Sequence, residues 1–372
     1  MSRTVFPVVL ALVAGSFAEP GFAQRPPAVT SPEVAPNGTV TWRLYAPKSS
    51  EVHLTGDWMG PGSKPIELTK DEAGVWTATA GPFEPNVYTY AYQVDGVSVP
   101  IDPSARRALS QAGRGASSAF EIPAIPARPW TSRDVPHGVV HQHPFRSTLQ
   151  GQDRPYHVYT PPDYEQKPRK RYPVLVLLPG TPGNEADWVS IGFANRILDN
   201  LLADRLIQPM VVLMPRADVM VRVGTRADNF GEFEPLLLRE ILPDFERRYR
   251  VDAKTESRAI AGYSLGGELA LSVGLRHPDV FRWVAGIDSS LQQQDFEPRL
   301  GPQLAAPAAF RSFRLIWLGC GAGDFLLPGN QKLDEMLTER HVLHTLRVIP
   351  GFHTMPTFRT LLVDLLPLLF RS

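Results

Sequence analysis

The spacing of apolar residues changes once along this chain, across a proline-rich stretch at residues 125–136. Before that stretch, apolar and polar residues alternate, which is typical of strands that bury one face. After it, short unbroken apolar runs are separated by segments with apolar residues three and four positions apart, as in buried parallel strands joined by helices. Because proline fixes its own backbone and blocks regular pairing, residues 125–136 are predicted to be a stiff linker between two folded units of different class.

The first unit is predicted to be a small all-β sandwich at residues 30–124. Tyr88, Tyr90 and Tyr92 show the period of two that half-buried strands require, and several other short runs share it. Turn signals such as Asp95-Gly96 separate these runs. Their spacing is about that of an antiparallel sandwich.

The second unit, residues 137–372, is predicted to be an α/β domain with a doubly wound, mostly parallel sheet. Its strands are expected at the unbroken apolar runs, which are residues 174–178, 210–214, 259–262, 284–287 and 315–318. Its helices are expected where apolar residues recur at helical spacing, which is at residues 194–202, 233–249, 265–277, 331–340 and 357–370. The alternation of strand and helix is that of a sheet covered by helices.

The balance of charge and the cysteine count exclude several kinds of function. Lys and Arg together equal Asp and Glu together, at 38 each, so we expect no basic surface for nucleic acid. The single cysteine, Cys320, excludes an intrachain disulfide and argues against a cysteine-based zinc site. We therefore expect no metal site and no nucleic-acid partner.

The amino-terminal residues have the features of a signal peptide, residues 1–23. Arg3 precedes an apolar run, and small residues around Ala23 predict cleavage after that residue. Residues 24–36 are rich in proline and small residues and are predicted to be a flexible lead-in. No later stretch reaches the roughly 20 apolar residues of a membrane helix. The mature chain is thus expected in the periplasm or outside the cell, without a membrane span.

The sharpest local motif is Gly262-Tyr263-Ser264-Leu265-Gly266, where a predicted strand ends and a predicted helix begins. In that setting the G-x-S-x-G pattern places the serine on a strained turn and exposes its hydroxyl. Glycine is needed on both sides because a Cβ would clash with the neighbouring strand and helix. We predict that Ser264 is a nucleophile and that the Leu265 N–H, at the start of the helix, stabilises an oxyanion.

A serine nucleophile of this kind needs an acid and a histidine later in the chain, each after a strand. His353 follows a predicted strand and precedes the last helix, so we predict it to be the base. Asp324 follows the predicted strand 313–318 on a glycine-rich loop and is our preferred acid. Asp288 also ends an apolar run and is the alternative. The remaining candidate histidines lie in or beside predicted helices and are expected to be structural: His277, His341 and His344.

The second oxyanion donor should lie in the loop that follows the predicted strand 174–178. That loop begins Pro179-Gly180-Thr181. The backbone N–H of Gly180 or of Thr181 could point at the developing charge, and the sequence does not separate the two.

The carboxyl-terminal unit resembles the putative esterase family, which includes feruloyl, acetylxylan and enterochelin-type siderophore esterases. The resemblance rests on these segments: Val158 to Pro162, Pro179-Gly180 with Trp188, Met214-Pro215, Arg258 to Gly267, His277 to Phe281, Cys320-Gly321 with Asp324-Phe325, and Gly351 to Thr354. The sandwich resembles the early-set immunoglobulin-like module that is related to glycogen-type carbohydrate-binding modules. That likeness rests on three segments: Gly56 to Trp58, Gly74 to Trp76 and Val87 to Tyr90.

The resemblance implies an α/β-hydrolase fold and a Ser-Asp-His triad. The triad falls on three residues already singled out: Ser264, Asp324 and His353. Pro179 stands where members usually have histidine, Leu265 where they have methionine, and Met355 where tryptophan is common. Trp188 and Met355 are expected to line the substrate pocket. Such changes alter which acid is accepted more readily than whether an ester is cleaved.

The sequence as a whole predicts a serine ester hydrolase that works through an acyl-enzyme and needs no cofactor. The expected substrate is a feruloyl or acetyl ester of a plant polysaccharide, held near the enzyme by the sandwich. Trp58 and Trp76 are candidate sugar platforms, although their alternation also fits a place in the sandwich core. Two alternatives are an enterochelin-like siderophore esterase and an inactive secreted carbohydrate-binding protein. The sequence leaves the oligomeric state open.

Overall fold

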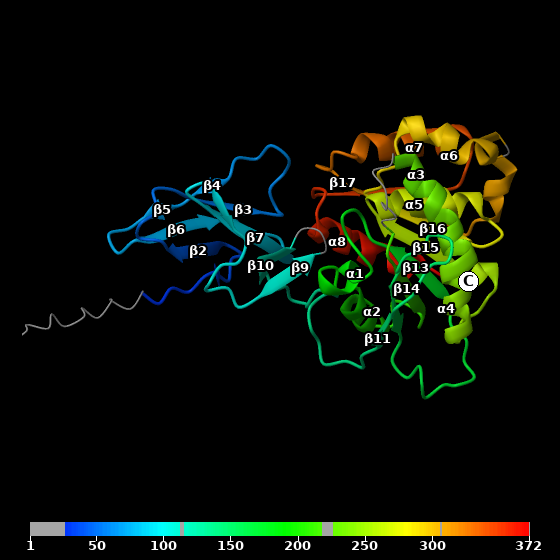
Figure 1. Ribbon diagram of the computed structural model, residues 1–372, viewed down its shortest axis with the longest axis horizontal. Helices are drawn as coiled ribbons and strands as arrows, with labels where there is room; N and C mark the ends of the chain where they lie inside the picture. The colour runs from blue at the N-terminus through cyan, green and yellow to red at the C-terminus, as the bar shows by residue number, and fades with distance from the viewer. Residues whose placement is uncertain (1–26, 112–114, 218–225, 306, 372) are drawn as a thin grey trace, which may run out of the picture.

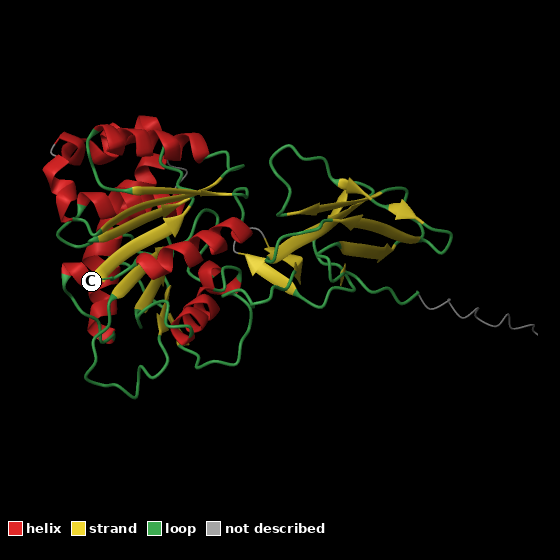
Figure 2. Cartoon of the chain, turned by 180° about the vertical axis from the view of Figure 1, so that it is seen from behind, coloured by secondary structure: helices red, strands yellow, loops and turns green. Residues whose placement is uncertain are grey.

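The chain folds into two lobes, a smaller all-β lobe and a larger α/β lobe, which lie side by side in Figures 1 and 2. The structure is a computed structural model, and it describes residues 27–111, 115–217, 226–305 and 307–371. The predicted signal peptide, residues 1–23, lies outside the described residues. Of the predicted lead-in, only the part from residue 27 onward is described.

The all-β lobe contains two antiparallel sheets, with strand orders β1-β2-β6-β5 and β4-β3-β7-β10-β9, and β8 pairs with β7. The strands are β1 Glu33–Val34, β2 Val40–Tyr45, β3 Val52–Gly56, β4 Ile66–Glu67, β5 Thr69–Lys70, β6 Val75–Ala80, β7 Val87–Val94, β8 Val97–Val99, β9 Ala108–Gln111 and β10 Gly115–Glu121. Every second residue of β2 is buried, namely Val40, Trp42 and Leu44. The predicted all-β sandwich is confirmed.

Aromatic side chains fill the space between these two sheets. Trp42 is fully buried, and its ring centroid lies 5.4 Å from that of Trp58 and 5.4 Å from that of Phe120. Trp76 is also buried, and its indole N–H donates to the Ala46 carbonyl oxygen at 2.9 Å. The prediction of Trp76 as a sugar platform is therefore wrong, because its ring belongs to the core. Trp58 keeps part of its surface exposed, and its role in sugar binding stays a prediction.

The α/β lobe is built on an eight-stranded sheet of order β11-β12-β14-β13-β15-β16-β17-β18. The pairs β11–β12 and β12–β14 are antiparallel, and all the others are parallel. The strands are β11 Val139–His143, β12 Tyr156–Thr160, β13 Val174–Leu178, β14 Val211–Pro215, β15 Arg258–Tyr263, β16 Trp283–Ile287, β17 Leu315–Gly321 and β18 Thr345–Ile349. The predicted α/β-hydrolase fold with a mostly parallel sheet is confirmed.

The apolar pattern did not predict the two antiparallel strands β11 and β12. β11 is an edge strand without a fully buried residue. β12 is buried throughout, but polar residues such as His157 and Thr160 interrupt its apolar run. A search for unbroken apolar runs therefore misses both strands.

Helices cover both faces of this sheet, as Figure 2 shows. Alternate residues of β13 belong to different apolar clusters, with Val174 and Val176 in one and Leu175 and Leu177 in the other. The α-helices are α1 Asp187–Ser190, α2 Ala194–Ala203, α3 Arg226–Pro235, α4 Leu242–Arg248, α5 Leu265–Arg276, α6 Gln293–Ala305, α7 Leu327–Glu339 and α8 Met355–Leu365. Burial on both faces explains why these strands appear in the sequence as unbroken apolar runs.

Besides the four-residue α1, which was not predicted, two longer helical regions differ from the prediction, and both contain proline. The single helix predicted at residues 233–249 is instead α3, a π-helical segment η1 at Leu236–Ile241, and α4. α6 was not predicted, and it contains Pro298 and Pro302. Proline has no N–H to donate and is normally excluded from helix interiors, so its presence hides a helix from sequence patterns.

The two lobes are joined by a buried arginine of α8, Arg359. Its guanidinium donates to the side-chain oxygen of Asn86 and, at 3.2 Å, to the Val87 carbonyl oxygen, both in the all-β lobe. It also donates to the Ile191 carbonyl oxygen of the α/β lobe at 2.8 Å. Arg359 is only 1% exposed, and these bonds engage both of its terminal nitrogens, whereas its Nε–H has no partner among the described residues. These contacts fix the all-β lobe against the first turns of α8, which begins two residues after His353.

Candidate active site

Ser264 occupies a strained turn between β15 and α5. Its φ of 55° and ψ of −123° lie in a region that non-glycine residues rarely adopt. A Cβ at Gly262 would lie 2.4 Å from the Gly266 carbonyl oxygen, and a Cβ at Gly266 would lie 2.4 Å from the Pro179 carbonyl oxygen. Both clashes would be with backbone, so glycine is required on each side of the turn. The close approach of strand, loop and helix raises Ser264 above the carboxyl end of the sheet.

The sheet brings His353 and Asp324 to Ser264. His353 Nε2 lies 3.0 Å from Ser264 Oγ, and His353 Nδ1 lies 2.7 Å from Asp324 Oδ2. Asp324 follows β17 and His353 follows β18. Parallel strands present their carboxyl ends at one edge of a sheet, which is why residues 60 and 89 positions after Ser264 converge on it.

The hydrogen bonds indicate which atoms of Ser264, His353 and Asp324 carry protons. Asp324 is 4% exposed and also accepts the Leu326 N–H at 2.8 Å. Although burial opposes it, the hydrogen bond from His353 and those from its other neighbours lower the pKa of Asp324. An ionised Asp324 accepts the Nδ1 proton of His353, which leaves the Nε2 lone pair facing the Ser264 hydroxyl. The arrangement can therefore take a proton from Ser264.

The loop after β13 lies directly against Ser264. A Cβ at Gly180 would be 2.8 Å from the Ser264 Cβ and 2.6 Å from the Tyr263 ring. The Gly183 N–H donates to the Gly180 carbonyl oxygen at 2.9 Å and closes a turn, on which Thr181 is exposed. On the other side, Leu265 is the first residue of α5, and the first N–H groups of a helix have no acceptor within it. Backbone donors thus border Ser264 on two sides.

Adding a single methyl group at Gly180 is expected to lower kcat about a hundredfold. Tyr263 cannot yield, because its ring stacks on Phe358 at 4.5 Å between centroids and meets Trp188 edge to face at 5.2 Å. The loop must therefore move away from Ser264, and a displacement of about 1 Å in a reacting geometry costs on the order of 100-fold. Steady-state ester hydrolysis by Gly180→Ala measures the loss.

The matched control for that substitution is Gly231→Ala. Gly231 is exposed on α3, and a Cβ there would meet no atom within 4 Å. Activity should be unchanged in Gly231→Ala. Equal activity of the two variants would mean that the loop after β13 does not position anything needed for hydrolysis.

Trp188 does not line a substrate pocket, so that prediction is wrong. The side chain has no exposed surface, and its indole N–H donates to the Leu178 carbonyl oxygen at 2.9 Å. Its ring supports Tyr263 from within the lobe. No sequence pattern distinguishes the two roles, because a tryptophan after a glycine-rich loop fits a pocket wall and a buried support equally well.

An aromatic residue that was not predicted lies beside the imidazole. The Phe325 ring centroid is 4.8 Å from that of His353, and 63% of Phe325 is exposed. Large exposed apolar side chains that border a reactive group commonly contact ligands. The available signal was its position directly after Asp324.

A cavity of about 180 Å³ lies between the two lobes, next to the segment that carries His353. Its lining comes from both lobes: Asp57, Thr89, Leu109, Gln111, Gly115, Ser117, Ile191, Thr354, Met355 and Arg359. Met355 lines this cavity, which is partly formed by the all-β lobe, and its role in binding substrate stays a prediction. Burial raises the pKa of Asp57 to about 7.

The all-β lobe also reaches the histidine segment outside this cavity. A Cβ at Gly60 would lie 2.6 Å from the Phe352 ring, the residue before His353. The loop after β3 therefore touches the backbone segment that holds the imidazole. Sequence patterns cannot show such a contact, because they carry no information on how two separately patterned units meet.

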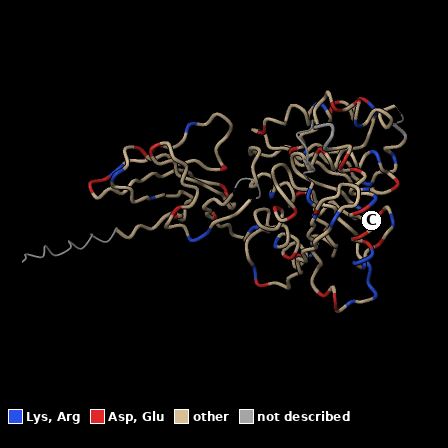
Figure 3. Tube along the Cα trace, in the orientation of Figure 1, with Lys and Arg blue, Asp and Glu red and all other residues tan. Residues whose placement is uncertain are grey.

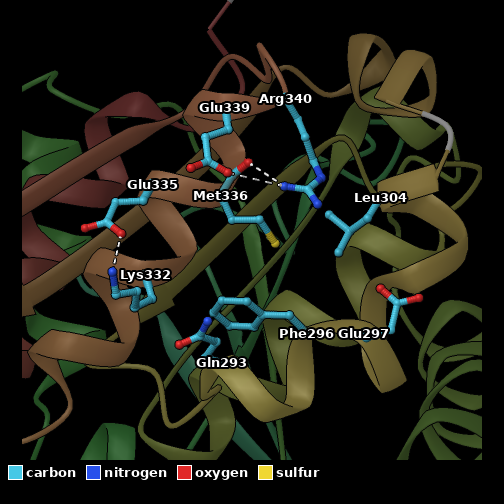
Figure 4. A pocket seen from close by; sticks show the side chains of 9 residues that line it. All are labelled: Gln293, Phe296, Glu297, Leu304, Lys332, Glu335, Met336, Glu339 and Arg340. Carbon is cyan, nitrogen blue, oxygen red and sulfur yellow. Dashed lines mark hydrogen bonds and ion pairs between the residues drawn. The ribbon is translucent and has the colours of Figure 1, made fainter.

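Other features of the described residues lie away from Ser264 or have a simpler explanation. A hollow of about 380 Å³ between α6 and α7 contains none of the candidate residues (Figure 4). Acidic and basic residues are interspersed along the backbone of both lobes (Figure 3). Asp288, Cys320 and Asp324 have possible metal-ligand atoms within 4.8 Å of one another, but these groups already hydrogen bond to each other and to His353. Within the described part of the chain, none of the helices is long and apolar enough to cross a membrane.

Comparison with known proteins gives two matched regions. Residues 147–295 match the putative esterase family, and residues 29–105 match carbohydrate-binding module 48, the isoamylase N-terminal domain. The chain is 32% identical over 303 residues to an endo-1,4-beta-xylanase/feruloyl esterase of Xylanibacter ruminicola. That alignment covers 78% of this chain but only 39% of the Xylanibacter protein.

Solved structures show the same fold. A ferulic acid esterase is 27% identical with a TM-score of 0.57, and the match covers 62% of this chain and 97% of that one. The enterobactin esterase of Shigella flexneri is 20% identical with a TM-score of 0.67, and the match covers 88% of this chain and 92% of that one. The second likeness therefore extends over both lobes.

Proposed function

We propose that this chain, whose residues 147–295 match the putative esterase family and whose residues 29–105 match carbohydrate-binding module 48, is an exported serine carboxylic ester hydrolase that works through an acyl-enzyme. The observation that carries the proposal is the continuous hydrogen bonding from Ser264 through His353 to Asp324 on the strained turn after β15. We further propose residues 1–23 as the export signal, with cleavage after Ala23.

In the proposed mechanism Ser264 Oγ attacks the ester carbonyl carbon. His353 Nε2 takes the serine proton and then gives it to the departing alcohol, and Asp324 holds the imidazole in the required tautomer. The backbone N–H of Leu265 and that of Gly180 or Thr181 stabilise the oxyanion of the tetrahedral intermediate. Water, activated by the same imidazole, then releases the acid from Ser264.

We propose a feruloyl ester of plant polysaccharide as the substrate, with an acetyl ester as the closest alternative. The 32% identical relative, whose name includes feruloyl esterase activity, supports this choice. Phe325 adds support, because an exposed aromatic ring beside His353 is suited to contact an aromatic acyl group. A domain that binds polysaccharide would raise the local concentration of ester groups around Ser264.

A siderophore ester is the second candidate substrate. The fold likeness to the enterobactin esterase covers both lobes, whereas the likeness to the ferulic acid esterase covers 62% of this chain. A catecholate trilactone would use the same proposed triad and differ only in the pocket that receives it.

Parallel assays on methyl ferulate, acetylated xylan and a ferric catecholate siderophore distinguish these functions. We expect methyl ferulate to be hydrolysed with the highest kcat/KM. Hydrolysis of the siderophore alone would mean that the substrate is a siderophore ester, and the proposed mechanism would still apply. Absence of hydrolysis, together with absence of labelling by a fluorophosphonate probe, would favour the inactive carbohydrate-binding protein instead.

A further inference from the structure

A second aspartate, Asp288, is buried beside Asp324. It follows β16 directly and has a φ of 42°, and its N–H donates to the Gly319 carbonyl oxygen at 2.7 Å. Its side chain has no exposed surface. A carboxylate oxygen of Asp288, one of Asp324 and the Cys320 sulfur all lie within 4.8 Å of one another. Asp288 is therefore fixed at both backbone and side chain next to the proposed acid.

The two oxygens of Asp288 have different surroundings. Oδ1 accepts the Gly321 N–H at 2.7 Å and the Cys320 thiol at 3.1 Å. Oδ2 is buried and receives no donor from the described residues. A carboxylate oxygen carrying charge would be strongly destabilised there, whereas a protonated oxygen needs an acceptor and Asp324 is adjacent. These surroundings favour a proton on Asp288 over a second negative charge there.

Electrostatics agrees with that assignment. Two buried carboxyl groups with oxygens within 4.8 Å of each other disfavour both being ionised, so one tends to keep its proton. Asp324 accepts the His353 Nδ1 proton and the Leu326 N–H, which favours its charged form. Burial, followed by contact with Asp324, raises the pKa of Asp288 well above its ordinary value. Asp324 and Cys320 are the titratable side chains that lie beside this carboxyl, and His353 is bonded to Asp324 on the far side of the pair.

We propose that Asp288 is a positioning residue that stays protonated at neutral pH and donates a hydrogen bond to Asp324, so that the pair carries one negative charge and holds His353 toward Ser264. This inference rests on the proposed function for its catalytic consequence, whereas the protonation of Asp288 rests on its position and burial beside Asp324. It assigns a role to the residue that sequence order left as the rival acid. The Cys320 thiol takes part by donating to the same carboxyl group.

Two substitutions distinguish a neutral Asp288 that donates a hydrogen bond to Asp324 from an ionised Asp288 that adds a second negative charge. Asn at position 288 keeps a donor toward Asp324 and an acceptor for the Gly321 N–H, so Asp288→Asn should lower kcat only about threefold. Asp288→Ala removes both and leaves buried groups unpaired, so it should lower kcat about 30-fold with little change in KM. Rescue by Asn relative to Ala is the result that a positioning hydrogen bond requires.

The pH dependence of kcat/KM shows whether Asp288 is neutral or carries a negative charge. If Asp288 is neutral, Asp288→Asn removes no charge, and the acid-side midpoint of kcat/KM should move by less than about 0.3 pH unit. If Asp288 is ionised, the same change removes a negative charge near the imidazole, and the midpoint should fall by about one unit or more. A fall of that size would overturn the proposal.

A measurement without substrate keeps the proposal testable if the enzyme assay fails or Asp288→Ala does not fold. Infrared difference spectra of the native chain and Asp288→Asn at neutral pH should contain the C=O band of one protonated carboxyl in the native chain only. NMR titration of the His353 ring in both proteins should give closely similar midpoints. If Asp288→Asn shows the same protonated-carboxyl bands as the native chain, the proposal is contradicted even if ester hydrolysis is confirmed.

Discussion

Ser264→Ala is expected to lower kcat for ester hydrolysis by about a millionfold and to leave the thermal stability of the chain nearly unchanged. The serine oxygen is the only atom lost, and the acyl-enzyme cannot form without it. Its backbone geometry, with φ at 55°, is as accessible to alanine as to serine, so the turn should persist. Initial-rate assays on methyl ferulate and calorimetry of both proteins measure the two effects.

Ser312→Ala is the matched control for this change. Ser312 donates its hydroxyl proton to the Ala309 carbonyl oxygen at 2.9 Å and lies on the short helix before β17, outside the candidate site. Labelling by a fluorophosphonate should be retained in Ser312→Ala and lost in Ser264→Ala. Undiminished turnover by the Ser264→Ala variant would exclude Ser264 as the nucleophile.

Asp324→Asn is expected to lower kcat by about three to four orders of magnitude. An asparagine can present its amide N–H to His353 Nδ1, which would force the ring proton onto Nε2. The imidazole then faces Ser264 with a donor and cannot accept the serine proton. The geometry stays intact, so KM should change little, and pre-steady-state rates should show acylation as the slowed step.

A second aspartate–histidine pair provides the control. Asp334 lies on α7 and accepts a hydrogen bond from His344 Nε2 at 2.9 Å. This pair is again a carboxylate bonded to an imidazole, but it lies away from Ser264. Asp334→Asn should retain activity within about twofold, as is usual for a substitution outside the reacting groups. If Asp288→Asn lost thousands-fold in kcat while Asp324→Asn lost little, the acid would be Asp288.

The fold was predictable because burial leaves a direct mark on the sequence. Residues of β13 alternate between two apolar clusters, so the strand shows as an unbroken apolar run, while β2 buries one face and alternates. The elements that were not predicted, such as α6 and β12, do not show these apolar patterns. α6 contains two prolines, and β12 buries polar side chains.

The convergence of Ser264, Asp324 and His353 was also predictable, since the residues follow strands whose carboxyl ends meet at one sheet edge. The choice between Asp324 and Asp288 was not settled by order, because both residues end a strand at that same edge. The structure places them side by side, with only Asp324 in contact with the imidazole. Trp188 and Arg359 were beyond sequence reasoning, because their roles depend on which surfaces face each other after folding.

Ser264 should become covalently acylated during turnover. The most direct test is mass spectrometry of the intact protein and its peptides, quenched by acid within the first turnovers on a feruloyl ester. We expect one added feruloyl group on the peptide that contains Ser264. The adduct should be absent from Ser264→Ala and should accumulate less in Asp324→Asn. Rapid ester hydrolysis with no adduct on Ser264 under any quench time, and equal turnover by Ser264→Ala, would contradict this expectation.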